Sequence, residues 1–153
     1  MTNETMLPEE EYGSIPAAQP IARPTSSCFV CGAENPRGLR LRFERRECGQ
    51  MWAIWTPEKA LEGFDGIVHG GIVSTVLDES MAKAVIASGV EALTAELRVR
   101  FRRQVVAEHP VQVSGWVTSQ QKRVLHAEAS LIDANHTELA HAWSSFLILR
   151  QER

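Results

Sequence analysis

The stretch from Gly66 to Glu79 places residues that can do chemistry inside an otherwise apolar run. His69 is followed by Gly70 and Gly71, and Asp78 lies nine residues after the histidine. Backbone N–H groups at the start of a helix have no intrahelical partner and carry partial positive charge, and glycine lets another group approach them. A histidine and two glycines at the start of a buried helix could therefore form a donor site for a carbonyl oxygen that becomes negative during acyl transfer. For the two glycines alone, a tight turn into a helix is the favoured interpretation.

Asp78 is a carboxylate within this apolar segment, a position that costs free energy unless the carboxylate is paired or lies at a cleft. Glu79 follows directly but points about 100° away around a helix. Only one of the two carboxylates can therefore occupy a given site, and the residue pattern does not choose between them. The alternative is that both lie on one solvated strip of the helix and pair with Lys83.

Cys28 and Cys31 have the spacing of half a zinc site. Structural zinc takes four protein ligands, and no second Cys-x-x-Cys or closely spaced histidine pair follows in the sequence. A thiol pair in a turn is the favoured interpretation, and no metal is expected. Cys48 brings the total to three cysteines, an odd number that argues against a disulfide framework and fits a reducing compartment.

These residues need elements to position them, and the strongest pattern is an apolar helix from Gly70 to about Ser88. Apolar residues cover nearly its whole circumference, so the rest of the chain must wrap it. Apolar and alternating runs between turn residues predict six strands, and residues 61–68 read as a loop. The expected strands span residues 39–43, 51–55, 93–105, 111–119, 123–133 and 138–150. This order predicts an α+β fold, with a curved antiparallel sheet wrapped around one long central helix.

The expected strand at residues 93–105 alternates cleanly between apolar and polar residues. This predicts that one face meets the core while the other is polar. The apolar face would carry Leu93, Ala95, Leu97, Val99 and Phe101, and the polar face Thr94, Glu96, Arg98, Arg100 and Arg102.

The chain reads as one domain, residues 26–153, preceded by a tail. Residues 1–25 carry four prolines and a run of three glutamates without an apolar face, so we expect them to be extended or disordered. A formal net charge of -3 gives no general attraction to nucleic acid or to anionic membranes. Apolar runs stop well short of the roughly 20 residues that a membrane span needs, and the N-terminus lacks a signal pattern. We therefore expect a cytoplasmic protein.

The run His69–Gly71 with Asp78, followed by the strand start Leu93–Leu97, resembles the hotdog-fold acyl-CoA thioesterases of the PaaI type, which are related to the human thioesterase superfamily members. Three further stretches are similar to a bacterial branch of that family: Cys28–Gly32, Asn35–Leu39 and Glu62–Gly66. The resemblance spans about residues 28 to 149. It implies a hotdog fold, an acyl-CoA substrate and no cofactor.

The resemblance also implies roles for individual residues. Asp78 matches the catalytic carboxylate, which acts as a general base on water or as a nucleophile toward the thioester. Gly70 matches the backbone N–H that polarises the thioester carbonyl, and His69 beside it shapes that pocket together with Gly71. Thr94 matches a strand residue that helps place the attacking water. In this family two protomers share each site, so a homodimer or a dimer of dimers is implied.

One departure from the family concerns the water. Several relatives place Asn or Gln in the loop before the histidine, where this chain has Gly63, and Glu62 is a candidate substitute. The acyl group is expected to contact apolar residues near the helix: Phe64, Val73, Leu77 and Met81. Four arginines on or near the polar strand face could receive the phosphates of CoA, or they are solvated surface charges: Arg98, Arg100, Arg102 and Arg103.

Two other functions are alternatives to thioester hydrolysis. A noncatalytic hotdog protein would bind acyl-CoA or a related ligand as a sensor or carrier, without hydrolysis. A hotdog hydratase normally needs an aspartate and a histidine a few residues apart on the helix, and no histidine lies between Ala82 and Glu108. The chain also lacks a Gly-x-Ser-x-Gly nucleophile elbow, so a serine hydrolase triad is not indicated.

Overall fold

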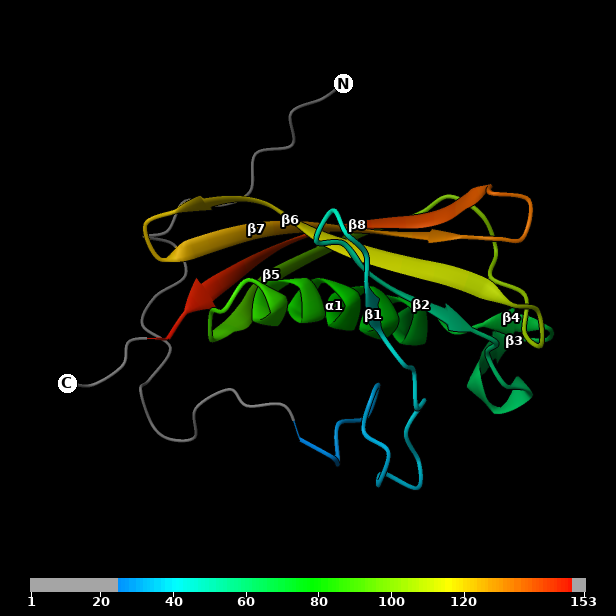
Figure 1. Ribbon diagram of the computed structural model, residues 1–153. Helices are drawn as coiled ribbons and strands as arrows, with labels where there is room; N and C mark the ends of the chain where they lie inside the picture. Colours follow the sequence, from blue (N-terminus) through cyan, green and yellow to red (C-terminus); the bar gives the residue numbers. More distant parts are fainter. Residues whose placement is uncertain (1–24, 150–153) are drawn as a thin grey trace.

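The computed structural model describes residues 25–149. A six-stranded antiparallel sheet curves over one long helix, α1 (Gly70–Ala87), which lies along a single face of the sheet (Figure 1). The strands follow the order β1-β2-β6-β7-β8-β5. They are β1 (Glu44–Arg45), β2 (Met51–Trp55), β5 (Ala92–Phe101), β6 (Val111–Gln121), β7 (Val124–Ile132) and β8 (Glu138–Ile148). The predicted α+β fold is confirmed.

Helix α1 supplies the centre of the core, as its apolar sequence predicts. Leu77 and Met81 are fully buried against the sheet, and truncating such a side chain to alanine typically costs about 2–5 kcal/mol. The closest approach is at β6, where a Cβ on Gly115 would lie 2.3 Å from the backbone oxygen of Ser80. Only glycine fits there, so the sequence of β6 fixes how closely helix and sheet pack.

Among residues 25–149, strand β5 pairs only with β8 and forms an edge of the sheet. A bulge at Ala95 places Thr94 opposite Phe146 and Glu96 opposite Ser145. Residues directly opposite in an antiparallel pair project to the same face, so Thr94 turns to the face of Phe146, which is 1% exposed. The uninterrupted alternation predicted for residues 93–105 is therefore wrong at this end, and the strand stops at Phe101.

The apolar side chains of β5 do not all reach the core, contrary to the prediction. Leu93, Leu97 and Phe101 are 38%, 37% and 54% exposed. Leu97 and Phe101 lie opposite the buried residues Ser144 and Ala140 of β8, so they share the core-facing side of the sheet. They remain exposed because β5 is the last strand and no further strand covers its outer edge.

The segments before α1 differ from the sequence-based expectation. Leu39 and Leu41 donate their N–H groups to the carbonyls of Phe29 and Val30, and Arg40 has a positive φ of 55°. The strand predicted at residues 39–43 is therefore wrong, and regular pairing begins only at β1. Residues 61–68 are not a plain loop either, because after the 3₁₀ turn η2 (Lys59–Leu61) the short strands β3 (Glu62–Phe64) and β4 (Ile67–Val68) pair with each other.

The tail expected at residues 1–25 lies, except for its last residue, outside the described part of the chain. Among the described helices, none is long and apolar enough to cross a membrane.

Candidate active site

The N-terminus of α1 is built around His69, whose Nδ1 accepts the N–H of Gly71 at 2.9 Å. The His69 carbonyl accepts from Ile72 and Val73. Within residues 25–149 the N–H of Gly70 has no hydrogen-bond partner. Gly70 therefore offers the free donor that an oxyanion site needs, whereas the N–H of Gly71 is already used by the helix cap.

The turn η2 and strand β3 hold His69 in place. Its N–H donates to the carbonyl of Leu61 at 2.8 Å, and a Cβ on Gly63 would lie 3.1 Å from the His69 Cα. A larger residue at position 63 would press on the histidine, so the Asn or Gln that relatives carry does not fit here without a shift. A shallow hollow beside the helix start is bordered by Glu62, His69, Gly71 and Thr75. The first three of these are expected site residues, so the fold brings them together.

Asp78 lies farther along α1 and contacts the edge strand. The hydroxyl of Thr94 donates to its Oδ1 at 2.9 Å, a contact that depends on the bulge at Ala95. Burial raises the pKa of Asp78 above its ordinary value, the Thr94 hydrogen bond works against that rise, and the charge of Glu79 adds to it. A half-buried carboxylate of raised basicity, held by one hydroxyl, suits proton transfer.

Glu79 lies on a different side of α1 from Asp78. Its Oε1 is 3.6 Å from the thiol sulfur of Cys28 and 3.8 Å from the Lys83 ammonium nitrogen. Glu79 pairs with Lys83 as the alternative interpretation predicts, but the shared solvated strip is wrong, since Asp78 contacts β5 and Glu79 contacts the loop before β1.

One chain does not bring Asp78 and the Gly70 N–H to the same point. They are eight residues apart on one helix, which at a rise of 1.5 Å per residue separates them by roughly 12 Å along the axis. A carboxylate and an amide at that separation cannot act on one thioester carbonyl. The two groups that the family resemblance assigns to one reaction therefore do not meet within one chain.

The residues expected around the acyl group fall into two sets. Phe64 is 79% exposed on the β3–β4 pair, while Val73, Leu77 and Met81 are at most 1% exposed and belong to the core cluster. In the single chain these three do not border the hollow at the helix start. Their contact with an acyl group stays a prediction.

The hydroxyl groups near the helix start are engaged by the backbone. Ser74 Oγ donates to the Gly70 carbonyl at 2.9 Å, and Thr75 Oγ1 donates to the Gly71 carbonyl at 2.8 Å. Ser145 lies 3.1 Å from Nδ1 of His126, but the serine is 0% exposed, so a substrate does not reach it. None of these hydroxyls is presented as a nucleophile.

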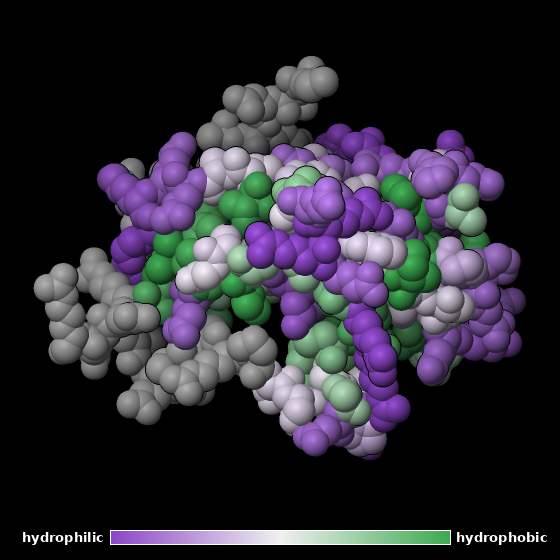
Figure 2. Space-filling view, in the orientation of Figure 1, coloured by the Kyte–Doolittle hydropathy of each residue, from purple (hydrophilic) through white to green (hydrophobic). Residues whose placement is uncertain are grey.

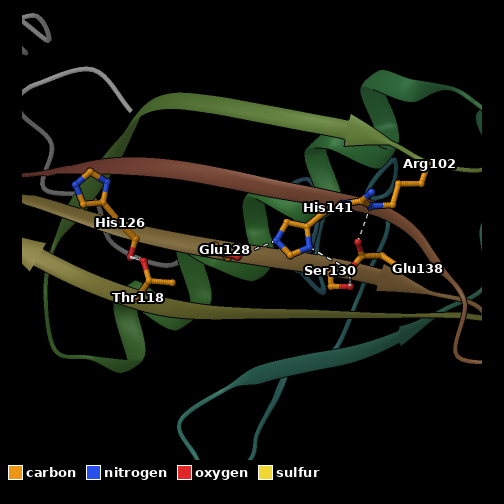
Figure 3. A network of polar contacts seen from close by, with 7 residues as sticks. All are labelled: Arg102, Thr118, His126, Glu128, Ser130, Glu138 and His141. Atoms are coloured by element: carbon orange, nitrogen blue, oxygen red, sulfur yellow. Dashed lines mark hydrogen bonds and ion pairs between the residues drawn. The ribbon is translucent and has the colours of Figure 1, made fainter. Parts of the chain in front are cut away.

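A polar network that the sequence did not point to lies on the sheet face away from α1 (Figure 3). His141 bridges Glu128 at 2.8 Å and Glu138 at 3.1 Å, while Arg102 and Ser130 each bond Glu138 at 2.8 Å. Burial acts to raise the pKa of Glu138, but hydrogen bonds from His141, Ser130 and Arg102 hold it below its usual range. The network ties β7, β8 and the end of β5 together.

The arginines considered for CoA phosphates are partly committed within the chain. Arg102 pairs with Glu138 at 2.8 Å, and Arg98 lies 4.0 Å from Glu96. Arg103 is exposed. Phosphate binding by this set therefore stays a prediction.

The pair Cys28 and Cys31 lies in a turn before β1, as the favoured interpretation predicts, and both residues are partly buried. Burial, with a hydrogen bond to Glu79, raises the pKa of the Cys31 thiol to about 12. A thiol of that pKa is protonated at neutral pH and is a poor nucleophile.

The chain is similar in sequence to known proteins. Residues 65–140 match the family model of the thioesterase superfamily. A candidate esterase of Saccharolobus solfataricus is 28% identical over 115 residues, which cover 74% of this chain and 76% of that protein.

Solved structures show the same fold at low sequence identity. A thioesterase superfamily protein has a TM-score of 0.76 at 23% identity; the match covers 78% of this chain but 62% of that one, less than two thirds of its length. A Streptococcus mutans protein crystallised with acetyl CoA has a TM-score of 0.68 at 14% identity, covering 74% and 91%. The Escherichia coli PaaI protein from the phenylacetic acid degradation operon has 0.68 at 16% identity, covering 73% and 81%. The hotdog fold is confirmed.

Proposed function

The chain belongs to the thioesterase superfamily, and we propose that it is a cytoplasmic acyl-CoA thioesterase that hydrolyses a thioester to a free acid and CoA. Membership supports thioester hydrolysis in general. The Streptococcus mutans neighbour with acetyl CoA supports the acyl-CoA substrate class. The observation that carries the site is the hydrogen bond from Thr94 to Asp78, because it fixes a half-buried carboxylate at the open edge of the sheet.

In the proposed reaction Asp78 accepts a proton from a water molecule, and the water oxygen attacks the thioester carbon. Negative charge develops on the carbonyl oxygen, where the Gly70 N–H donates a hydrogen bond. The carbon–sulfur bond then breaks, the sulfur takes the proton, and the acid and CoA leave. A preorganised amide donor of this kind typically contributes about 100- to 1,000-fold in rate, and a general base about 100- to 10,000-fold.

The alternative role of Asp78 is nucleophilic attack on the thioester carbon, which breaks the carbon–sulfur bond, releases CoA as the thiolate and leaves a mixed anhydride that water then opens at the carboxyl carbon of Asp78. A single turnover in ¹⁸O-water separates the two routes. With a general base the label enters the free acid. With a nucleophile the label stays on Asp78 after the first turnover, and mass spectrometry of the peptide containing Asp78 detects it.

The separation of Asp78 and Gly70 supports a site shared between two copies of the chain. Each pair would combine the carboxylate of one protomer with the helix start of the other. The β5 edge supports this arrangement, because no other strand of residues 25–149 covers its outer side and its exposed Leu97 and Phe101 form a surface that a second copy can cover. Phe101 lies against the helix start, with its ring 3.4 Å from where a Cβ on Gly70 would be. The proposal therefore includes a homodimer, with a dimer of dimers as the larger assembly.

A coenzyme A release assay against aromatic, short-chain and long-chain acyl-CoA thioesters tests this function. We expect the wild type to hydrolyse at least one class and Asp78→Asn to lose about 100- to 10,000-fold in kcat. Asparagine keeps the size of the side chain and an acceptor for Thr94, so the fold is preserved. Unchanged turnover in a folded Asp78→Asn protein would remove Asp78 from the mechanism. Binding of acyl-CoA without hydrolysis across the panel would instead favour the noncatalytic alternative.

A further inference from the structure

The loop before β1 and the middle of α1 bring two thiols and a carboxylate together, away from Asp78. One ligand atom from each of Cys28, Cys31 and Glu79 lies within 4.8 Å of the other two. Glu79 follows Cys28 by 51 residues, so the cluster is a product of the fold. In the orientation of Figure 1 the loop lies below α1, and the space-filling view shows it as a projecting lobe of mixed hydropathy (Figure 2).

The turn that carries the thiols has a fixed geometry. The N–H of Gly32 donates to the Cys28 carbonyl at 2.9 Å, and a Cβ on Gly32 would lie 2.4 Å from both the Cys28 nitrogen and the Ser26 carbonyl oxygen. Glycine is therefore required directly after the second cysteine. Because the N–H groups of Leu39 and Leu41 also bond the residues between the cysteines, the two thiols are held toward α1 before any ligand arrives.

Glu79 contributes a carboxylate whose contacts with Cys28 and Lys83 are both long. Its side chain is 18% exposed, and its contacts with Cys28 and Lys83 measure 3.6 and 3.8 Å. Charge-assisted hydrogen bonds from nitrogen are usually about 2.7–2.9 Å. A half-buried carboxylate with such long contacts is a favourable place for a cation.

We propose that Cys28, Cys31 and Glu79 bind one thiophilic divalent cation, best matched by zinc, which joins the loop before β1 to the central helix. Tetrahedral zinc with bond lengths of about 2.3 Å to sulfur and 2.1 Å to oxygen sets sulfur and oxygen about 3.6 Å apart. The sulfur of Cys28 and Oε1 of Glu79 are 3.6 Å apart. Three protein ligands leave the fourth position to water.

The charges of the cluster balance when the cation is bound. Both thiols release their protons to solvent on binding, so two thiolates, one carboxylate and a divalent ion carry a net charge of minus one. The ammonium of Lys83, 3.8 Å from Glu79, compensates that charge. A monovalent or strictly oxygen-preferring ion would match this donor set less well, since thiolates select soft or borderline metals.

The test uses the full-length reduced protein, dialysed with zinc or cobalt(II) and then against metal-free buffer. The wild type should retain one metal per chain by elemental mass spectrometry and show a sulfur-to-cobalt charge-transfer band. Cys31→Ser should lose the band, and Glu79→Gln should bind more weakly while keeping it. Cys48→Ser is the matched control, because Cys48 is exposed and lies outside the cluster, and it should behave as the wild type.

A second measurement needs no variant. In the zinc-loaded wild type a thiol reagent should modify Cys48 rapidly, and Cys28 and Cys31 only after a chelator is added. The proposal is overturned if the reduced wild type retains no metal and gives no cobalt band, if the band survives in Cys31→Ser, or if non-reducing mass spectrometry finds a disulfide between Cys28 and Cys31 in protein purified under the same conditions.

Discussion

Asp78 and Glu79 are adjacent carboxylates on one helix, yet their surroundings differ in nearly every respect. Asp78 receives a short hydrogen bond from the hydroxyl of Thr94 on the edge strand. Glu79 meets a thiol and an ammonium group at longer distances, beneath the loop before β1. A rotation of about 100° around α1 separates the two environments. The contacts of each carboxylate therefore depend on which segment packs against its side of α1, since the two side chains carry the same functional group.

The largest expected difference between the two environments is in kcat, when each carboxylate is replaced by its amide. Asp78→Asn should lose about 100- to 10,000-fold in kcat, whereas Glu79→Gln should keep kcat within a small factor of the wild type, because a general base acts only where it reaches the water. Coenzyme A release on the best acyl-CoA substrate measures both. Equal losses in the two variants would show that the carboxylates act as one unit.

The next largest effect concerns the amide at the helix start. Gly70→Pro removes one N–H at the first helical position, where proline is tolerated, and His69 has φ -57° and ψ 131°, which suits a residue before proline. We expect a loss of about 100- to 1,000-fold in kcat. Gly70→Ala keeps the N–H and is the control, since its Cβ would meet only the exposed Phe101 ring at 3.4 Å. If the alanine variant were as impaired as the proline variant, packing rather than the N–H would be responsible.

A third prediction concerns Thr94, the residue of the edge strand that contacts Asp78. Thr94→Val removes the hydroxyl that bonds Asp78, and a hydrogen bond to a charged group is worth about 1.5–3 kcal/mol, so kcat should fall by about 10- to 100-fold. Thr94→Ser keeps the hydroxyl and should retain most of the activity. Thermal unfolding of both variants checks that the edge strand is intact. A valine variant with full activity would leave the hydroxyl without a role in positioning Asp78.

The smallest expected effect is on stability, at a carboxylate far from both environments. The folded pKa of Glu138 is lowered, so its contribution to stability is present above the unfolded pKa and is lost as the pH falls through the folded value. Glu138→Gln should therefore reduce the free energy of unfolding near neutral pH by about 1 kcal/mol or less, and the difference should vanish in acid. Urea unfolding across that pH range measures it, with Glu47→Gln, a change at an exposed carboxylate outside the network, as the control.

Much of the fold follows from the sequence because periodicity reports burial. The apolar run from Gly70 predicts α1 from its first residue, and the four strands after it lie within a few residues of their predicted positions, apart from the early end of β5 at Phe101. The sequence pattern does not predict the bulge at Ala95, since an extra residue in a strand leaves the apolar alternation of the sequence unchanged. The β3–β4 pair was also missed, because two or three residues are too few for a period to register.

The candidate site could be predicted only in part, for a related reason. The helix start and Asp78 stand out because glycines and a carboxylate interrupt an apolar run. The contact of Glu79 with Cys28 joins residues 51 positions apart, and the cluster around His141 joins three strands; neither has a local signal. Thr94 entered through a family resemblance, while its alternation pointed to the wrong face.

In the proposed assembly the carboxylate of one protomer and the helix start of another form one site. This arrangement is tested most directly by unfolding and refolding Asp78→Asn together with Gly70→Pro in equal amounts. Each mixed dimer then contains one site with both changes and one with neither, so random reassociation should restore about a quarter of the wild-type sites. We expect this recovery of coenzyme A release from two inactive proteins. Activity that stays at the level of the separate variants, although mixed dimers have formed, would contradict it.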